Sequence, residues 1–320
     1  MNGTVLELRG LSKRFANHTA VEGVSLTIAP GELHALLGPS GCGKTTVLRM
    51  IAGFETPTTG DVVLAGERIN DLRPYQRNVS TVFQSYALFP HLTVRENVEF
   101  GLKQKGASDM GRRVRDALEL VQLSHKADAK PAQMSGGEKQ RAALARSLVL
   151  EPQVLLLDEP LSALDPNLRK QVRSELKALQ RRVGITFVMV THDQEEALSM
   201  ADRITLLHQG RVEQIGSPQD LYLRPATRFA AGFLGAMNWI GDIGVRPEVT
   251  NIASQPPGHG ARVHAARVRS TMFLGDCVHV EAELGNGEAL IAQVERHEGP
   301  FVIGDPVHVW WHPHDELRFS

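Results

Sequence analysis

The chain has 320 residues and a mass of 35.1 kDa, which corresponds to about two domains of ordinary size. Hydrophobic residues make up 42% and charged residues 22% of the sequence, which excludes an intrinsically disordered chain. The formal net charge of −1 provides no basis for bulk electrostatic attraction, so no nucleic-acid partner is expected.

The sequence also indicates a compartment. No uninterrupted apolar run approaches the roughly 20 residues that a membrane-spanning helix needs. The first residues lack a basic segment followed by an apolar one, so no signal peptide is expected. The two cysteines, Cys42 and Cys277, lie far apart and suggest no disulfide framework, which favours a reducing, cytoplasmic setting.

The first 235 residues are expected to form an α/β domain. Early strands and one helix are predicted, the strands over Val5–Leu8, Val24–Ile28, Leu33–Leu37 and Asp61–Ala65 and the helix over Val47–Ala52. Three further apolar segments are expected to be parallel strands covered on both faces, over Val79–Phe83, Val154–Asp158 and Thr186–Thr191.

A helix-rich insertion is expected at about residues 90–150. Thr93 and Glu96 have the spacing of a capping box, which predicts a helix beginning there. Further along, apolar residues fall on one helical face, namely Met110, Val114, Leu118 and Val121.

The composition changes near residue 235. All nine lysines lie between Lys13 and Lys177, whereas residues 241–320 contain six arginines, no lysine and eleven acidic residues. Short alternating segments follow, and Gly285-Asn286-Gly287 separates two of them, which is typical of a β-hairpin. Residues 236–320 are therefore predicted to form a small all-β domain.

A glycine-rich turn follows the predicted strand Leu33–Leu37. The run from Gly38 to Thr45 fits the P-loop pattern, in which backbone amides and the positive end of the next helix surround phosphates. Lys44 is expected to reach the β- and γ-phosphates of a nucleotide, and the Thr45 hydroxyl to ligate Mg²⁺. Cys42 is expected to fill the loop rather than to act as a nucleophile. The nucleotide-binding residues expected here are Gly38, Pro39, Ser40, Gly41, Cys42, Gly43, Lys44, Thr45 and Thr46.

The apolar strand Val154–Asp158 ends in two carboxylates. Asp158 is placed to hold Mg²⁺, and Glu159 is the candidate to activate the attacking water. These two motifs alone leave kinases, helicases, switch GTPases and transport ATPases open. An ordinary P-loop kinase would also need an acceptor-binding lid.

A third motif narrows the choice. Ser135 has the position of a helix N-cap, and Gly136 and Gly137 expose the first amides of the helix that follows. The run Ser135–Arg141 resembles the signature motif of ATP-binding-cassette (ABC) ATPases. The resemblance implies a P-loop fold with a helical subdomain and a head-to-tail homodimer, in which the signature of one chain covers the γ-phosphate held by the other. Glu138 replaces the commoner Gln, with little expected loss.

Four further positions match this family in order. The resemblance implies that Gln84 contacts Mg²⁺ and the attacking water and leads toward a membrane partner. It implies that Asp165 lies in the loop that crosses the dimer interface. His192 would hydrogen-bond the γ-phosphate and order Glu159, and Phe15 would stack on adenine. The resemblance covers roughly residues 4–235.

Two segments resemble importers in particular. Tyr86–Val98 is similar to the segment that importer ATPases place against a permease, although its apolar residues would also suit simple packing of the helical insertion. Val245–Glu248 and Phe273–Asp276 are similar to the transport-associated OB domain of many importer ATPases. Three nearby histidines are expected on an edge strand rather than around a metal, namely His308, His312 and His314.

Together these resemblances imply the ATP-hydrolysing subunit of a bacterial ABC importer, with ATP and Mg²⁺ as ligands. The implied partners are a second copy, integral-membrane permease subunits and, indirectly, an extracytoplasmic solute-binding protein. The expected location is the cytoplasmic face of the inner membrane. Thr81–His91 looks most similar to spermidine/putrescine importers, while phosphonate, sulfate, iron and sugar importers remain alternatives. A soluble ABC ATPase with a regulatory role is a further alternative.

Overall fold

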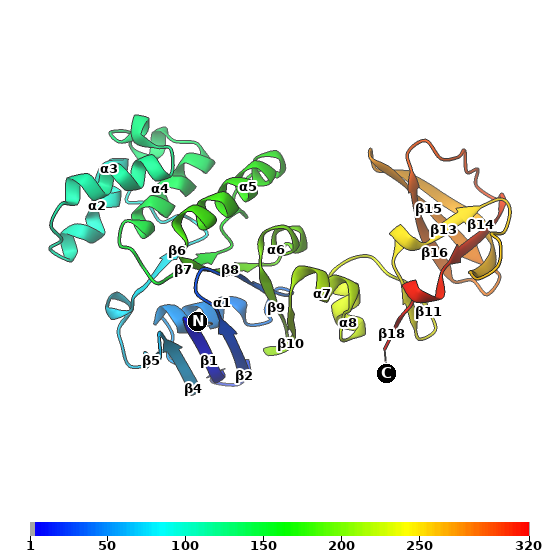
Figure 1. The fold of residues 1–320 in the computed structure, drawn as a ribbon, viewed down its shortest axis with the longest axis horizontal. Helices are drawn as coiled ribbons and strands as arrows, with labels where there is room; N and C mark the ends of the chain where they lie inside the picture. The colour runs from blue at the N-terminus through cyan, green and yellow to red at the C-terminus, as the bar shows by residue number, and fades with distance from the viewer. Residues whose placement is uncertain (1–3, 320) are drawn as a thin grey trace. The chain divides into compact units, whose positions relative to one another are not determined.

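The computed structural model describes residues 4–319. It divides after Gln219 into two compact units, which we describe separately (Figure 1). Helix α7 (Pro218–Leu223) begins at this division, and α8 (Arg228–Phe233) lies within the second unit. Within residues 4–319, no helix combines the length and the apolar character needed to cross a membrane.

The first unit is built on a six-stranded sheet in the order β10-β9-β3-β8-β7-β6. Its strands are β3 (Leu33–Leu37), β6 (Val79–Val82), β7 (Val154–Asp158), β8 (Thr186–Thr191), β9 (Arg203–His208) and β10 (Arg211–Gly216). Every pair is parallel except β9 with β10. Leu37 lies opposite Thr191, and Asp158 lies opposite Val190. The carboxyl ends of β3, β8 and β7 therefore meet at one edge of the sheet.

The interior strands confirm the predicted burial on both faces. All residues of β3 and β8 are buried, as are the first four of β7. The edge strand β6 was expected to be buried in the same way, and that prediction is wrong. Only Val82 of β6 is fully buried, because β6 has a neighbour on one side alone and carries the polar residues Ser80 and Thr81.

A second, antiparallel sheet has the order β2-β1-β4-β5. It consists of β1 (Leu6–Phe15), β2 (His18–Ile28), β4 (Thr59–Leu64) and β5 (Glu67–Arg68). Helix α1 (Lys44–Ala52) contributes Val47, Leu48 and Ile51 to one core with side chains of both sheets. This shared core holds the beginning of α1 beside the end of β3.

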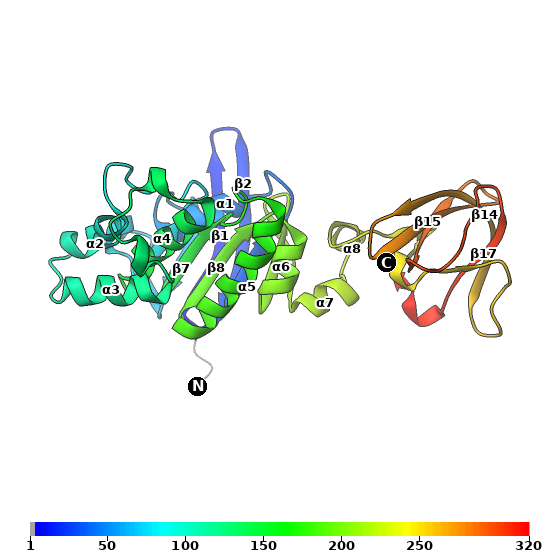
Figure 2. The ribbon, with the colours of Figure 1, turned by 90° about the horizontal axis from the view of Figure 1, so that it is seen from above.

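Three helices form a lobe within the first unit, and Figure 1 shows them together. They are α2 (Val94–Gln104), α3 (Met110–Leu120) and α4 (Gly136–Leu148). The capping box predicted for Thr93 and Glu96 is present at the start of α2. Val114 and Leu118 are buried on α3, as the periodicity predicted. Helices α5 (Pro166–Val183) and α6 (Gln194–Met200) lie side by side, as Figure 2 shows.

The second unit contains a five-stranded antiparallel sheet in the order β13-β17-β14-β15-β16, beside a three-stranded sheet in the order β11-β12-β18. The strands are β11 (Asn238–Ile240), β12 (Ile243–Val245), β13 (Asn251–Ala253), β14 (Arg262–Phe273), β15 (Cys277–Leu284), β16 (Ala289–Glu295), β17 (Pro306–Trp311) and β18 (Leu317–Arg318). Asn238 joins the two sheets, because its side chain exchanges hydrogen bonds of 2.7 and 2.8 Å with the backbone of Ile291. An OB-like arrangement results, with Trp311 in its core.

Short 3₁₀ helices connect these elements, at Pro74–Gln76, Ser124–Lys126, Pro131–Gln133, Pro247–Val249 and Pro313–Asp315. The predicted hairpin at Gly285–Gly287 is confirmed, since β15 and β16 pair across it. The edge-strand prediction for His308 is wrong, because β17 pairs with β13 on one side and β14 on the other. Within the described residues, no group of three or more His, Cys, Asp or Glu is arranged to hold a metal ion.

Arg246 explains why α8 and most of α7 belong to the second unit. Its guanidinium lies 4.0 Å from the centroid of the Tyr222 ring and donates to the backbone oxygens of Tyr222 and Ala231, each at 3.1 Å. The Tyr222 hydroxyl donates to Glu248 at 2.6 Å. Burial and this hydrogen bond raise the pKa of Tyr222 to about 12.

Candidate functional site

The loop between β3 and α1 requires glycine at two positions. Gly38 has φ +153° and Gly43 has φ +102°. A Cβ atom at residue 38 would lie 2.2 Å from the carbonyl oxygen of Leu207, and one at residue 43 would lie 2.5 Å from that of Ala20. The loop is therefore pressed against backbone on both sides, and no side chain fits there.

Lys44 is the first residue of α1, and its ammonium is buried in the concave side of this loop. It donates to the carbonyl oxygens of Gly38 at 2.7 Å and Pro39 at 2.9 Å, and lies 3.7 Å from the Cys42 sulfur. Among residues 4–319, no carboxylate forms an ion pair with it. A buried cation without an anionic neighbour suits an anionic ligand, so the loop fits a phosphate group.

The remaining loop residues show graded exposure. Cys42 is buried, Thr45 and Thr46 are half-buried in the first turn of α1, and Ser40 and Gly41 are exposed. The positive end of α1 and the Lys44 ammonium thus lie at the same place.

Two carboxylates follow β7 directly. Burial raises the pKa of Asp158, the negative charge of Glu159 raises it further, and Arg49 acts in the opposite direction. Adjacent carboxylates supply the oxygen ligands that a divalent cation such as Mg²⁺ takes. The donor set therefore fits Mg²⁺.

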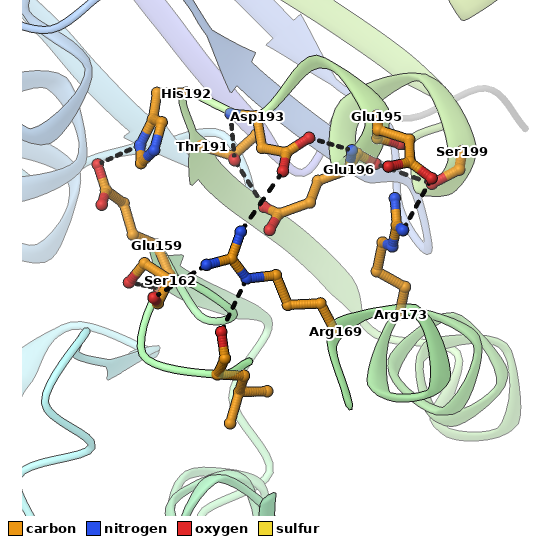
Figure 3. Close-up of polar contacts among 11 residues, drawn as sticks. Glu159, Ser162, Arg169, Arg173, Thr191, His192, Asp193, Glu195, Glu196 and Ser199 are labelled. Carbon is orange, nitrogen blue, oxygen red and sulfur yellow. Dashed lines mark hydrogen bonds and ion pairs between the residues drawn. The ribbon is translucent and has the colours of Figure 1, made fainter. Parts of the chain in front are cut away.

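Glu159 is held firmly through its backbone. It has φ +45°, its N–H donates to the Val190 oxygen at 3.0 Å, and its own carbonyl oxygen accepts the Ser162 amide and hydroxyl. Its carboxylate lies 3.3 Å from Gln84 Nε2 and 3.2 Å from His192 Nδ1. These three side chains line a cavity of about 120 Å³, and Figure 3 shows the pairing of Glu159 with His192. Gln84 follows β6, Glu159 follows β7 and His192 follows β8. The three side chains therefore come from the ends of neighbouring strands.

Ser135, Gly136 and Gly137 form a different group. Ser135 caps α4 by accepting the Glu138 N–H, while the Glu138 carboxylate accepts the Ser135 N–H at 2.8 Å. A Cβ atom at residue 136 would lie 3.1 Å from a methyl group of Leu164, which precedes Asp165. Asp165 in turn caps α5 by accepting the Leu168 N–H at 3.0 Å.

The structure thus separates the predicted site residues into groups. Among residues 4–319, no hydrogen bond or ion pair joins Ser135, Gly136 or Gly137 to the loop at residues 38–46. Phe15 lies on β1, where it is 41% exposed and Lys13 Nζ lies 4.8 Å from the centroid of its ring.

Comparison with known proteins decides the family. The sequence matches a family model described as ABC transporter over residues 21–162 and one described as TOBE domain over residues 243–319. The spermidine/putrescine import ATP-binding protein PotA of Bacillus cereus is 45% identical over 324 residues, which cover 99% of each chain. The PotA of Oleidesulfovibrio alaskensis is 58% identical over 236 residues, which cover 73% of this chain and 63% of that protein. This chain belongs to the ABC transporter family.

Solved structures support the same family. A dimeric ATP-binding cassette in a post-hydrolysis state, bound to ADP and Pi, has a TM-score of 0.58 and 34% identity, and covers 67% of this chain and 98% of that chain. A nucleotide-free ATP-binding cassette from an ABC transporter has a TM-score of 0.60 and 26% identity, and covers 67% and 92% of the two chains. The expected fold is confirmed, as are the family resemblance and the OB-type C-terminal domain. The chain is an ATPase of the ABC transporter family.

Two residues important for the shape of this cassette escaped the sequence analysis. Arg146 on α4 donates to the carbonyl oxygens of Ala87 at 2.6 Å and Tyr86 at 2.9 Å. Asn97 on α2 is fully buried, and its side chain exchanges hydrogen bonds with the backbone of Phe89. Together they fix the segment that follows Gln84. No local pattern distinguishes Arg146 from other helical arginines, whereas the apolar surroundings of Asn97 are a weak signal.

Proposed function

We propose that this chain powers the import of polyamines by binding and hydrolysing ATP on a membrane permease. The observation that carries the proposal is the meeting of the Lys44 loop, the Asp158–Glu159 pair and His192 at the carboxyl edge of one parallel sheet. Ligands of α/β sheets bind at this edge. The printed names of the Bacillus and Oleidesulfovibrio relatives support the polyamine substrate.

Within the site, each residue has a proposed role. Lys44 and the loop amides bind the β- and γ-phosphates, and Phe15 stacks on the base. Thr45, Gln84 and Asp158 hold Mg²⁺, which when bound neutralises charge on the phosphates. Glu159 accepts a proton from the attacking water, and His192 orients the Glu159 carboxylate through the contact of 3.2 Å.

The signature group is proposed to act on a second copy of the chain. The first four amides of an α-helix have no partner within that helix. In α4 the Glu138 N–H is taken by Ser135, which leaves the amides of Gly136 and Gly137 as donors for an anion. Because this group makes no polar contact with its own phosphate loop, a head-to-tail dimer would complete each site. The dimeric solved relative is consistent with this arrangement.

The permease is proposed to dock on the helical lobe. A groove of about 440 Å³ runs between the 3₁₀ helix at Pro74–Gln76 and α2, lined by Tyr75, Val79, Phe100 and Leu150 among others. Phe100 is 40% exposed and packs against Phe89 with ring centroids 4.7 Å apart. An exposed aromatic side chain in a groove suits a short helix of a membrane partner. A location at the cytoplasmic face of the inner membrane follows, with an extracytoplasmic binding protein supplying the solute.

We assign the ATPase domain to residues 1–235, with its helical subdomain at about residues 90–150, and the OB-like domain to residues 236–320. In this assignment α7 and α8 form the connection. Arg246 of the β-domain donates a hydrogen bond to each of them, at Tyr222 and Ala231.

The proposal is tested by affinity capture of the tagged Glu159→Gln variant from detergent-solubilised membranes in the presence of ATP. Slowed hydrolysis should trap the ATP-bound dimer with its partners, which mass spectrometry identifies. Glu195→Gln is the matched control, because Glu195 is an exposed carboxylate on α6. Recovery of one or two multi-spanning proteins, and polyamine uptake that depends on them, is the expected result. Ribosomal, DNA-associated or only soluble partners would refute the importer role.

A further inference from the structure

Three cations on α5 face α6 and the loop before it. Arg169, Arg173 and Lys177 are spaced four residues apart and therefore lie on one side of α5. Arg173 donates to Glu195 at 2.8 Å, and Lys177 donates to the Ser199 carbonyl oxygen at 3.1 Å. Arg169 lies within ion-pair distance of Asp193, at 4.0 Å (Figure 3). The three contacts join α5 to α6 along its length.

Arg169 differs from the other two because it also binds the loop that carries Glu159. Its Nε donates to the Leu164 carbonyl oxygen at 3.0 Å, and its Nη2 donates to that of Ser162 at 3.5 Å. The nitrogen that faces Asp193 is Nη1. All three guanidinium nitrogens therefore contact protein atoms, in a planar fork that lysine cannot reproduce.

The two segments that Arg169 joins are those that carry Glu159 and His192. Ser162 donates from both its amide and its hydroxyl to the Glu159 carbonyl oxygen. Asp193 directly follows His192, and its Oδ1 is occupied as the cap of α6, where it accepts the Glu196 N–H at 3.1 Å. Its Oδ2 is the atom that faces Arg169. A displacement of Arg169 would therefore displace both Glu159 and His192, the two residues of this contact.

We infer that Arg169 is a positioning residue for ATP hydrolysis, which holds the loop at residues 159–165 and the segment at residues 192–193 in one geometry. Among residues 4–319, no hydrogen bond or ion pair joins Arg169 to the phosphate loop or to Gln84, so we expect nucleotide binding not to depend on it. The inference rests on the proposed roles of Glu159 and His192. Misplacing a catalytic group by about 1 Å can lower a rate by about 100-fold.

The test compares Arg169→Met with Arg173→Met in the full-length chain. Methionine keeps much of the apolar stem in both cases, and both variants lose one contact between α5 and α6. Arg169→Met is expected to lower kcat by about 10-fold or more, with the KM for ATP within about twofold of the original. Arg173→Met is expected to leave both constants within about twofold. Arg169→Lys keeps the charge but not the fork, so kcat should recover only in part.

The possible outcomes distinguish a positioning role of Arg169 from simple packing of α5 against α6. Equal losses in Arg169→Met and Arg173→Met, with matching falls in melting temperature, would overturn the inference in favour of simple helix packing. An unchanged kcat in Arg169→Met would overturn it as well. Glu159→Gln, assayed in parallel, tests the proposed function on its own. If Glu159→Gln hydrolyses ATP normally, the assignment of the base fails. If only the Arg169 result is negative, the base stands and the positioning role falls.

Discussion

The phosphate loop should be intolerant of a single methyl group at residue 38. A Cβ atom there would lie 2.2 Å from the Leu207 carbonyl oxygen and 2.7 Å from the Cys42 sulfur. An ordinary contact is about 3.5 Å, so Gly38→Ala must move the loop or β9 by about 1 Å. The strained φ costs about 1–3 kcal/mol and the overpacking about 1–3 kcal/mol more. The free energy of unfolding should therefore fall by roughly 2–6 kcal/mol.

The same shift should weaken nucleotide binding. Lys44 is held by the Gly38 carbonyl oxygen at 2.7 Å, so movement of that oxygen also moves the ammonium. Loss of one hydrogen bond to a charged group costs about 1.5–3 kcal/mol, which corresponds to a rise in the Kd for ATP of about 10-fold or more. Thermal unfolding measures the first effect, and titration with a fluorescent ATP analogue measures the second.

Gly66→Ala is the matched control. Gly66 has φ +87° in the turn between β4 and β5, and no atom lies within 4 Å of the Cβ position. Its substitution therefore adds backbone strain alone, about 1–2 kcal/mol, and should leave ATP affinity unchanged. If Gly38→Ala were no less stable than Gly66→Ala and bound ATP normally, the close packing of the loop against β9 would not be what requires glycine.

Two further predictions concern other parts of the cassette. Asn97→Ala should lower the free energy of unfolding by about 1–3 kcal/mol for each backbone group of Phe89 and Leu92 left unpaired. It should also reduce permease recovery in the affinity capture. Unchanged recovery would argue against permease docking near the segment that Asn97 fixes. Burial raises the pKa of Glu196 above its ordinary value of 4.5, so the folded state binds this proton more tightly than the unfolded state does. That contribution to stability is complete below the ordinary pKa and is lost as the pH rises through the folded pKa. Glu196→Gln cannot ionise, so its melting temperature should fall less than that of the original chain between about pH 4 and pH 8; equal falls would contradict the assignment.

Central parallel strands were the most predictable part of the fold. The predicted ranges for β3, β7 and β8 coincide with those in the structure. These strands are apolar on both faces, so their sequence depends little on what packs against them. The prediction failed for β6, because its position at the edge of the sheet is set by the order of strands, and its two polar residues, Ser80 and Thr81, were the only local sign of it. His308 was misplaced for the same reason.

Site residues were predictable where the chemistry needs a run of neighbouring residues. The phosphate loop, the two carboxylates and the capped signature helix each lie in one short segment. Arg169 could not be found in this way. It and Arg173 lie one turn apart on the same polar side of α5, and only the tertiary fold places one of them against the loop of Glu159.

The arrangement of the sheet divides the site into a rigid part and an adjustable part. The phosphate loop and Asp158 stand at the ends of β3 and β7, whose register is set by continuous parallel ladders through β8. Gln84 and His192 lie just beyond the strands, where both are exposed and meet Glu159 only through contacts of 3.2 to 3.3 Å. Binding residues placed on rigid elements keep their geometry, whereas loop residues can respond to a neighbouring protein. Gln84 lies two residues before the segment Tyr86–Val98, whose Phe89 packs against Phe100 in the groove that we propose as the permease contact. A permease would therefore be expected to control hydrolysis through the position of Gln84 and His192, and to change ATP affinity much less.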